Sequence, residues 1–229
     1  MYLVFNEGYS ATEGDALIRR ELCAEAIRLG RVLATLMPDE PEVLGLLGLM
    51  LLQDSRRDTR VSSAGELVLL EDQDRSRWDR SEIREGNAVL DRALRLGSAG
   101  PYQLQAAIAA LHAEAARPEE TDWRQITLLY GRLFDVQPSP VVALNRAVAV
   151  AMAEGPERGL EAVEPLAPDL DRYHHFHSAR ADLLRRLDRP DEAAEAYRRA
   201  LELTGNAVER RFLRRRLSEV EGDRPEDPG

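Results

Sequence analysis

Three of the four histidines are close together in the sequence. Of all the residues, these three have the spacing that most resembles a metal-binding or catalytic site. His174 and His177 are three positions apart, so on a helix both imidazoles would lie on one face. Two imidazoles can begin a zinc site, but a catalytic site needs a third protein ligand and a structural site a fourth. The sequence places no acid or histidine to complete the set, since His112 is the only other histidine. We therefore predict no metal and no cofactor, and we interpret His174 and His177 as packed or partner-contacting residues.

The common catalytic and nucleotide-binding motifs are missing from the sequence. Gly45 and Gly48 fall inside an expected helix rather than in a phosphate-binding loop, and the chain has no lysine to serve a Walker motif. No serine stands in a strand–turn–helix nucleophile elbow. Cys23, the single cysteine, falls in the apolar pattern of a helix and is predicted to be a small buried hydrophobe. We therefore expect a protein that is not an enzyme.

The charge balance excludes further classes of function. The 229 residues carry 31 basic side chains, all arginine, against 41 acidic ones, a formal net charge of −10. Sequence-independent binding to nucleic acid or to an anionic membrane needs a net basic face.

The sequence also gives no sign of a membrane span or a signal peptide. The longest nearly pure apolar stretch, residues 43–52, is about half the ~20 residues that a membrane span needs, and the first ten residues lack the features of a signal peptide. We predict a cytoplasmic protein that binds neither nucleic acid nor a membrane.

A charged string at residues 71–79 alternates acids with arginines around one tryptophan. It contains Asp72, Asp74, Arg75, Arg77 and Trp78 and directly follows an apolar run at residues 67–70. Arginine and tryptophan at this density are typical of interface hot spots, so all five are candidate partner contacts. The alternative is a self-paired loop that Trp78 anchors to the rest of the fold.

Beyond that string, the expected helices place three polar residues where a partner could be held. Asn145, Arg146 and Arg180 fall on helices that would line a groove, where they could bind a carboxylate or backbone amides. The alternative for each is a solvated side chain or an internal ion pair.

The elements that must position these residues are helices, because the chain is rich in Ala, Leu, Arg and Glu and poor in aromatics. Between residues 138 and 206 the pattern repeats at an offset of 34, the period of tetratricopeptide helix–turn–helix units. We predict an all-α, tetratricopeptide-like solenoid of about four to five helix pairs, with one long insertion at about residues 53–79. Residues 1–220 would form a single domain, and residues 221–229 a disordered tail.

Six strings in series resemble one known family. They are YLVFNEGY (residues 2–9), PDEPEVLGLL (38–47), LEDQDRSRWD (70–79), GPYQLQAAIAA (100–110), TDW (121–123) and SPVVALNRAVA (139–149). Together they resemble the C-terminal extension of bacterial extracytoplasmic-function RNA polymerase sigma factors, in the class that carries a tetratricopeptide-like domain. The resemblance extends to about Leu217.

The resemblance implies a regulatory module that controls its own sigma factor. Its expected partners are RNA polymerase and the sigma regions of the full-length protein, while the promoter-reading regions are not in this sequence. Residues 5–9 would follow the linker from the second promoter-reading region, which adds Asn6, Glu7 and Tyr9 to the candidate partner contacts. It also agrees with the abrupt hydrophobic start, which indicates a fragment of a longer chain. The alternative function is a stand-alone adaptor that binds peptides or proteins, and a third is a small-molecule sensor or enzyme that uses His174 and His177.

Overall fold

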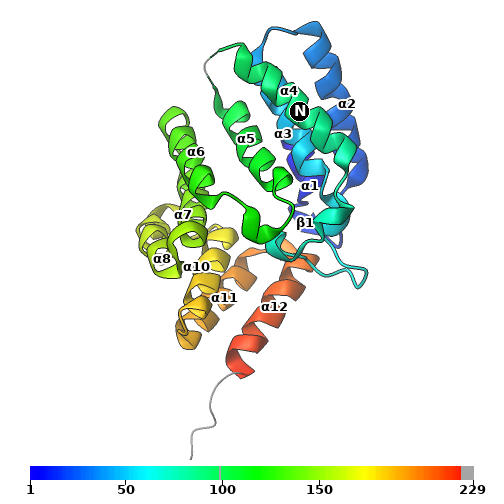
Figure 1. The fold of residues 1–229 in the computed structure, drawn as a ribbon. Helices are drawn as coiled ribbons and strands as arrows, with labels where there is room; N and C mark the ends of the chain where they lie inside the picture. The colour runs from blue at the N-terminus through cyan, green and yellow to red at the C-terminus, as the bar shows by residue number, and fades with distance from the viewer. Residues whose placement is uncertain (98, 223–229) are drawn as a thin grey trace, which may run out of the picture.

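The computed structural model describes residues 1–97 and 99–222, and its regular structure is mostly helical (Figure 1). The first half holds α1 (Tyr2–Tyr9), α2 (Arg20–Leu36), α3 (Pro41–Asp54), α4 (Arg80–Arg95), α5 (Pro101–Glu114) and α6 (Trp123–Val136). The second half holds α7 (Pro140–Glu154), α8 (Pro156–Val163), α9 (Ala167–Leu170), α10 (His174–Arg186), α11 (Pro190–Leu203) and α12 (Ala207–Gly222). Short 3-10 turns are η1 (Arg57–Thr59), η2 (Leu70–Asp72), η3 (Arg75–Arg77), η4 (Pro118–Glu120) and η5 (Glu164–Leu166). The prediction of an all-α protein is confirmed.

Local sequence explains where most of these helices begin. Proline stands at the first position of α3, α5, α7, α8 and α11, where its missing N–H and its fixed φ suit the first turn. Side-chain caps mark the starts of two further helices, α4 and α6, and add to the proline at the start of α7. Asp79 accepts hydrogen bonds from Ser81 N and Glu82 N at the start of α4, Asp122 caps α6 and Ser139 caps α7.

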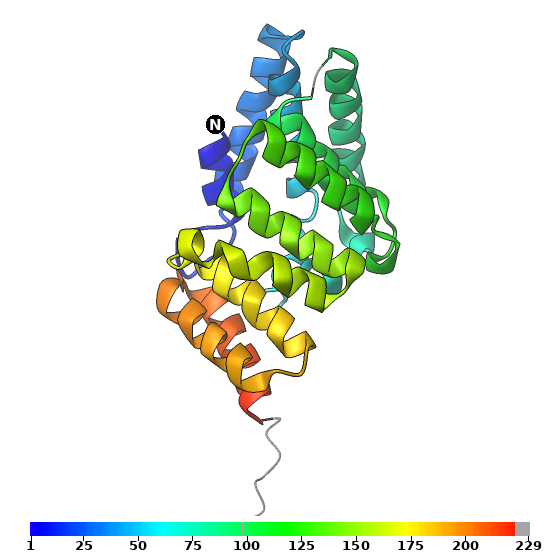
Figure 2. The same ribbon diagram turned by 90° about the vertical axis from the view of Figure 1, so that its left-hand side faces the viewer.

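The helices of the second half follow one another in chain order down the molecule (Figure 2). Their shared core depends on small residues, because Ala193 and Ala200 of α11 are fully buried and so let α11 lie close to α10. Tyr197 fills the space between them and is 1% exposed. A large side chain at either alanine would push the two helix axes apart.

The first half has its own core around α3. Met50 and Leu51 are buried there against Phe5 of α1 and Cys23 of α2. Burial raises the pKa of the Cys23 thiol to about 12, so the thiol stays protonated and unreactive at neutral pH. The prediction that Cys23 is buried is confirmed.

A short parallel pairing joins the loop after α1 to the segment before α12, and the sequence did not predict it. β1 (Glu13–Gly14) pairs with β2 (Gly205–Asn206), with Glu13 opposite Gly205 and Gly14 opposite Asn206. The buried Asn206 side chain donates to Ala11 O and Ala16 O, at 3.0 and 3.1 Å, and accepts from two backbone N–H groups of α12. The N-terminal loop is thereby fixed to the first turn of α12.

The predicted insertion lies between the end of α3 at Asp54 and the start of α4 at Arg80. At the other end, α12 runs to Gly222, so residues 221–222 are helical rather than part of the expected tail; residues 223–229 lie outside the described residues. The single-domain boundary stays a prediction. Within residues 1–97 and 99–222, no helix has both the length and the apolar character needed to cross a bilayer.

Candidate functional site

The insertion buries the arginine that we singled out as a partner contact. Arg75 is 4% exposed. Its Nη1 donates to His112 O and Ala115 O at 3.0 and 2.9 Å, and its Nη2 donates to Thr121 Oγ1 at 3.1 Å. These carbonyls close the C-terminal end of α5, where backbone acceptors have no partner within the helix and a positive charge is favourable. Arg75 therefore holds the insertion to the end of α5.

Trp78 is also enclosed, at 3% exposed, and packs with Leu49, Leu52 and Ile83. Its indole Nε1 donates to Thr59 Oγ1 at 3.0 Å, and the Arg75 guanidinium lies 5.1 Å from the ring centroid. This burial favours the alternative interpretation of the string, in which the tryptophan anchors the loop.

The other three residues of the string stay on the surface. Asp74 accepts from Ser76 N at 3.0 Å and so caps η3, while Arg77 donates to Asp58 O at 3.4 Å. The side chain of Asp72 is exposed. These three remain available to a partner, but their contacts with the chain are local.

The candidate partner contacts in α1 hold the N-terminal loop, residues 10–19, in place. Glu7 accepts from Thr12 N and Thr12 Oγ1, at 3.2 and 2.8 Å, and pairs with Arg19 at 3.3 Å. The Arg60 guanidinium lies 3.7 Å from the Tyr9 ring centroid and also donates to Tyr9 O. Asn6 is half-buried. Asn6, Glu7 and Tyr9 are therefore each partly exposed to solvent.

A groove of about 500 Å³ runs between α6, α7 and α8. Its lining residues are Thr127, Phe134, Ala143, Arg146, Ala147, Val150, Glu154, Arg158, Glu161 and Ala162. Arg146 and its neighbour Asn145 are exposed, and the Arg146 guanidinium lies beside Gly131 of α6, where a Cβ atom would be 3.8 Å from Arg146 Cζ.

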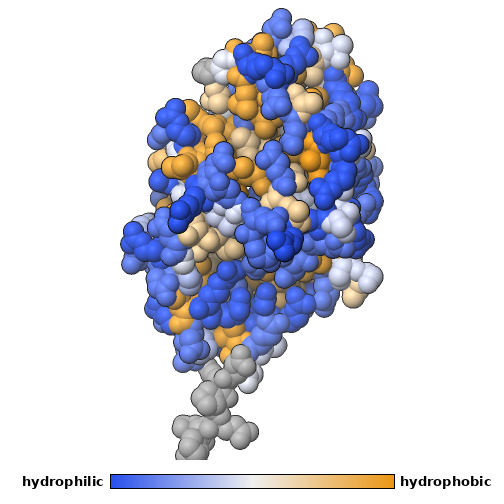
Figure 3. All heavy atoms as spheres, viewed as in Figure 1, coloured by the Kyte–Doolittle hydropathy of each residue, from blue (hydrophilic) through white to orange (hydrophobic). Residues whose placement is uncertain are grey.

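Apolar side chains continue beyond the groove along the outside of α6. Leu128 is 72% and Val136 50% exposed. Figure 3 shows apolar residues gathered over the part of the surface where α5 and α6 lie. A guanidinium beside an apolar surface can bind a carboxylate while its neighbours bury a hydrophobic side chain of a partner.

Arg180 and His177 have partners within the chain. Arg180 Nε donates to Glu164 Oε1 at 2.8 Å. His177 is 8% exposed, and its Nε2 lies 2.7 Å from Asp171 O. His177 thus points to a backbone carbonyl and does not join His174 in one ligand set.

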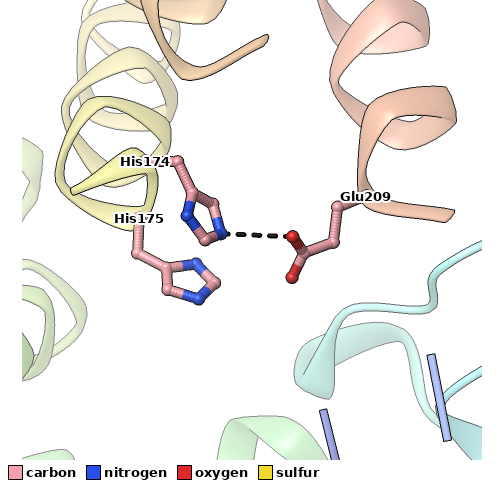
Figure 4. Close-up of side chains that lie close together, drawn as sticks. All are labelled: His174, His175 and Glu209. Carbon is pink, nitrogen blue, oxygen red and sulfur yellow. Dashed lines mark ion pairs between the residues drawn. The ribbon is translucent and has the colours of Figure 1, made fainter. Parts of the chain in front are cut away.

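A different cluster forms around His174, and sequence reasoning missed its third member. His174 and His175 begin α10, and Glu209 lies in the first turn of α12 (Figure 4). One ligand atom from each side chain lies within 4.8 Å of the other two, and His174 Nε2 is 3.1 Å from Glu209 Oε2. The two imidazole centroids are 3.8 Å apart. Only the packing of α12 near the start of α10 brings Glu209 to this place.

Electrostatics set the protonation states within the cluster. The protein packed around the His175 imidazole, and then the neighbouring His174, lowers the pKa of His175, although the residue keeps an exposed edge, so its imidazole is neutral at pH 7. For Glu209, burial raises the pKa, but the contacts with His174 and Thr204 outweigh it and the net pKa is lowered. The cluster therefore presents a carboxylate and a neutral imidazole at pH 7.

Comparison with known proteins gives two matches. Residues 1–94 match the model of a family described as "Family of unknown function (DUF6596)"; they comprise α1 to nearly the end of α4. "Uncharacterized protein R00370" of Rhizobium meliloti (strain 1021) is 53% identical to this chain over 220 residues. That match covers 96% of this chain and 52% of the relative, so the chain spans about half the relative's length.

Proposed function

We propose that this chain is the regulatory, protein-binding domain of a sigma factor of the extracytoplasmic-function class, located in the cytoplasm. The domain would be built as a tetratricopeptide-like solenoid. The observation that carries the proposal is the series of six family-like strings. They fall on the elements that build the fold, among them the turn before α3, the insertion and the starts of α5 and α7.

The helix positions support the solenoid part of the proposal. α7 and α10 begin at Pro140 and His174, 34 residues apart, and α8 and α11 begin at Pro156 and Pro190, again 34 apart. This is the tetratricopeptide period. Adjacent helices of a pair pack on each other, with small residues buried between α10 and α11, as such units require.

The length of the relative supports a second protein region. A chain that spans about half of a relative 53% identical to it has the size expected of one module in a longer protein. In the resembled family the other region reads promoters and binds core polymerase.

The groove between α6 and α8 is the surface we assign to the partner. Arg146 is exposed there, apolar side chains flank it, and Glu154 and Arg158 form part of its wall. We propose that the sigma regions or core polymerase dock on this groove rather than on Arg75 and Trp78, whose side chains are buried.

Run-off transcription by the full-length factor with core polymerase tests this function. We expect Arg146→Glu in the groove to change transcript yield from the cognate promoter by about tenfold, as loss of a hot-spot contact would. Arg28→Glu makes the same change on α2, where Arg28 is exposed and pairs with Glu25, and should leave the yield unchanged. Equal yields from the wild type and both variants, with unchanged helical content, would contradict the proposal.

The reading frame that encodes the chain separates the proposal from the adaptor alternative. Sigma regions in frame upstream of residue 1 are expected. A frame that begins at Met1 would favour a stand-alone adaptor, and the same groove variants would then be tested for peptide binding.

A further inference from the structure

We infer that His174, His175 and Glu209 form a binding site for a divalent metal ion of the zinc class. This site is separate from the groove of the proposed function, and the family model that matches residues 1–94 does not reach it. It joins the start of α10 to the start of α12 (Figure 4).

The donor set selects the class of ion. Two imidazole nitrogens and one carboxylate oxygen suit zinc and its neighbours among the transition metals. Magnesium and calcium prefer shells made of oxygen, and this cluster offers a single carboxylate. The cluster thus supplies the three protein ligands that an open zinc site requires, and leaves the fourth position to water or to a group from a partner.

The spacing is close to what one ion needs. Ligand atoms around a tetrahedral zinc ion lie about 3.4 Å from one another, given metal–ligand distances near 2.1 Å. His174 Nε2 and Glu209 Oε2 are already 3.1 Å apart, and all three ligand atoms lie within 4.8 Å of one another. The exposed His175 ring is the member of the cluster that has room to turn toward the other two.

One buried atom in the cluster lacks a good partner. His174 Nε2 is buried and makes no well-aligned hydrogen bond, although the Glu209 carboxylate is its near neighbour. Unsatisfied buried nitrogens are uncommon in native proteins. A metal ion between the imidazole and the carboxylate would satisfy the imidazole nitrogen; Glu209 Oε2 already accepts a hydrogen bond from Thr204 Oγ1.

The surroundings already orient the carboxylate as a ligand. Thr204 Oγ1 donates to Glu209 Oε2 at 2.7 Å, and Asn206 Oδ1 accepts from Glu209 N at 3.3 Å. Such supporting contacts fix a ligand's direction and affect metal affinity. Asn206 also holds the N-terminal loop, so an ion here would clamp α10, α12 and that loop together.

Two helix N-termini, each partially positive, face the site and oppose the bound cation. The carboxylate of Glu209 offsets this effect. We therefore expect micromolar zinc affinity rather than the much tighter binding of closed structural sites.

Isothermal titration of the chelator-treated chain with zinc chloride tests the site. We expect one zinc ion per chain, a higher thermal unfolding midpoint with zinc, and no comparable response to magnesium chloride. His175→Ala and Glu209→Gln should each weaken zinc binding at least about tenfold. Glu219→Gln makes the second change on an exposed residue of the same helix, and His177→Gln changes the neighbouring histidine; both should bind zinc like the wild type.

Several results would overturn the site. One is the absence of saturable zinc binding by the wild type. A second is binding that persists unchanged in both His175→Ala and Glu209→Gln. The third is equal loss in Glu219→Gln, which would indicate nonspecific binding to the acidic surface. Because His175 is exposed, its truncation should leave the helical content intact, so a lost signal there reports on the ligand.

Discussion

The insertion and the histidine cluster both contain residues that the sequence marks as functional candidates, but the two regions are built in opposite ways. In the insertion, Arg75 and Trp78 are buried, and the Arg75 guanidinium makes three hydrogen bonds to neutral oxygens. At the start of α10, the half-buried His174 and Glu209 and the exposed His175 bring one ligand atom each to within 4.8 Å of one another. The first arrangement uses its polar groups to hold the fold together, and the second places two imidazoles beside a carboxylate, the donor set of the metal site that we propose.

The type of a charged residue therefore does not tell whether it stabilises the fold or is available to a ligand. A guanidinium has donors only and can cap the carbonyls at a helix end. Imidazoles and carboxylates have lone pairs that an ion can use. What decides the role is which acceptors or donors the fold places within reach.

Truncation of the buried tryptophan is expected to have the largest effect in this comparison. Trp78→Ala leaves a cavity among Leu49, Leu52 and Ile83 and should lower the free energy of unfolding by about 3–5 kcal/mol. Urea denaturation followed by circular dichroism measures it. The control Arg77→Ala changes the exposed neighbour and should cost less than about 0.5 kcal/mol. Equal losses in the two variants would mean that Trp78 is not the anchor.

Replacement of the buried arginine is expected to have the next largest effect. Arg75→Met keeps much of the side-chain volume but leaves His112 O and Ala115 O without their donor. Since lost bonds to charged groups cost the most, we expect a loss of about 2–3 kcal/mol in the same denaturation experiment. A loss confined to transcription, with unchanged unfolding, would return Arg75 to the candidate partner contacts.

The pH dependence of stability gives a smaller effect. Burial, and then the charges of Arg56 and Arg75, lowers the pKa of His112 to about 3. The unfolded chain binds a proton there below about pH 6.5, so stability should fall as pH drops from 6.5 toward 3, by up to about 1.4 kcal/mol per pH unit. His112→Phe should flatten this slope and keep the edge-to-face contact with Trp123. An unchanged slope in the variant would assign the pH dependence to other groups.

The smallest effect is expected at an ion pair near the surface. Arg180 and Glu164 form a partly exposed pair at 2.8 Å, and such pairs contribute about 0–1 kcal/mol. Arg180→Ala should therefore hardly change the unfolding midpoint in urea. A loss comparable with that of Arg75→Met would show that exposure is a poor guide to the role of arginine in this chain.

Much of the helical framework could be predicted, because its signals are local. Prolines at the helix starts, the Asp79 cap and the offset of 34 each act within a few residues or recur along the chain. The insertion was predicted because no helical pattern fills the segment between α3 and α4.

The rest depends on contacts between distant residues. Arg75 is buried only because the open carbonyls of α5 come to it, and the charged string gives no sign of that. The two-residue strands β1 and β2 pair across nearly the whole chain. Glu209 joins the histidines through helix packing, with no spacing rule that links it to His174. That such distant residues lie close together cannot be predicted from a single sequence.

We propose that this chain regulates a sigma factor through the groove between α6 and α8. Titration calorimetry of the purified chain with the purified sigma regions and with core polymerase tests this proposal. We expect saturable one-to-one binding to at least one of them, weakened about tenfold by Arg146→Glu and unchanged by Arg28→Glu. No binding to either component up to about 100 µM, far weaker than specific complexes of standard size, would contradict it.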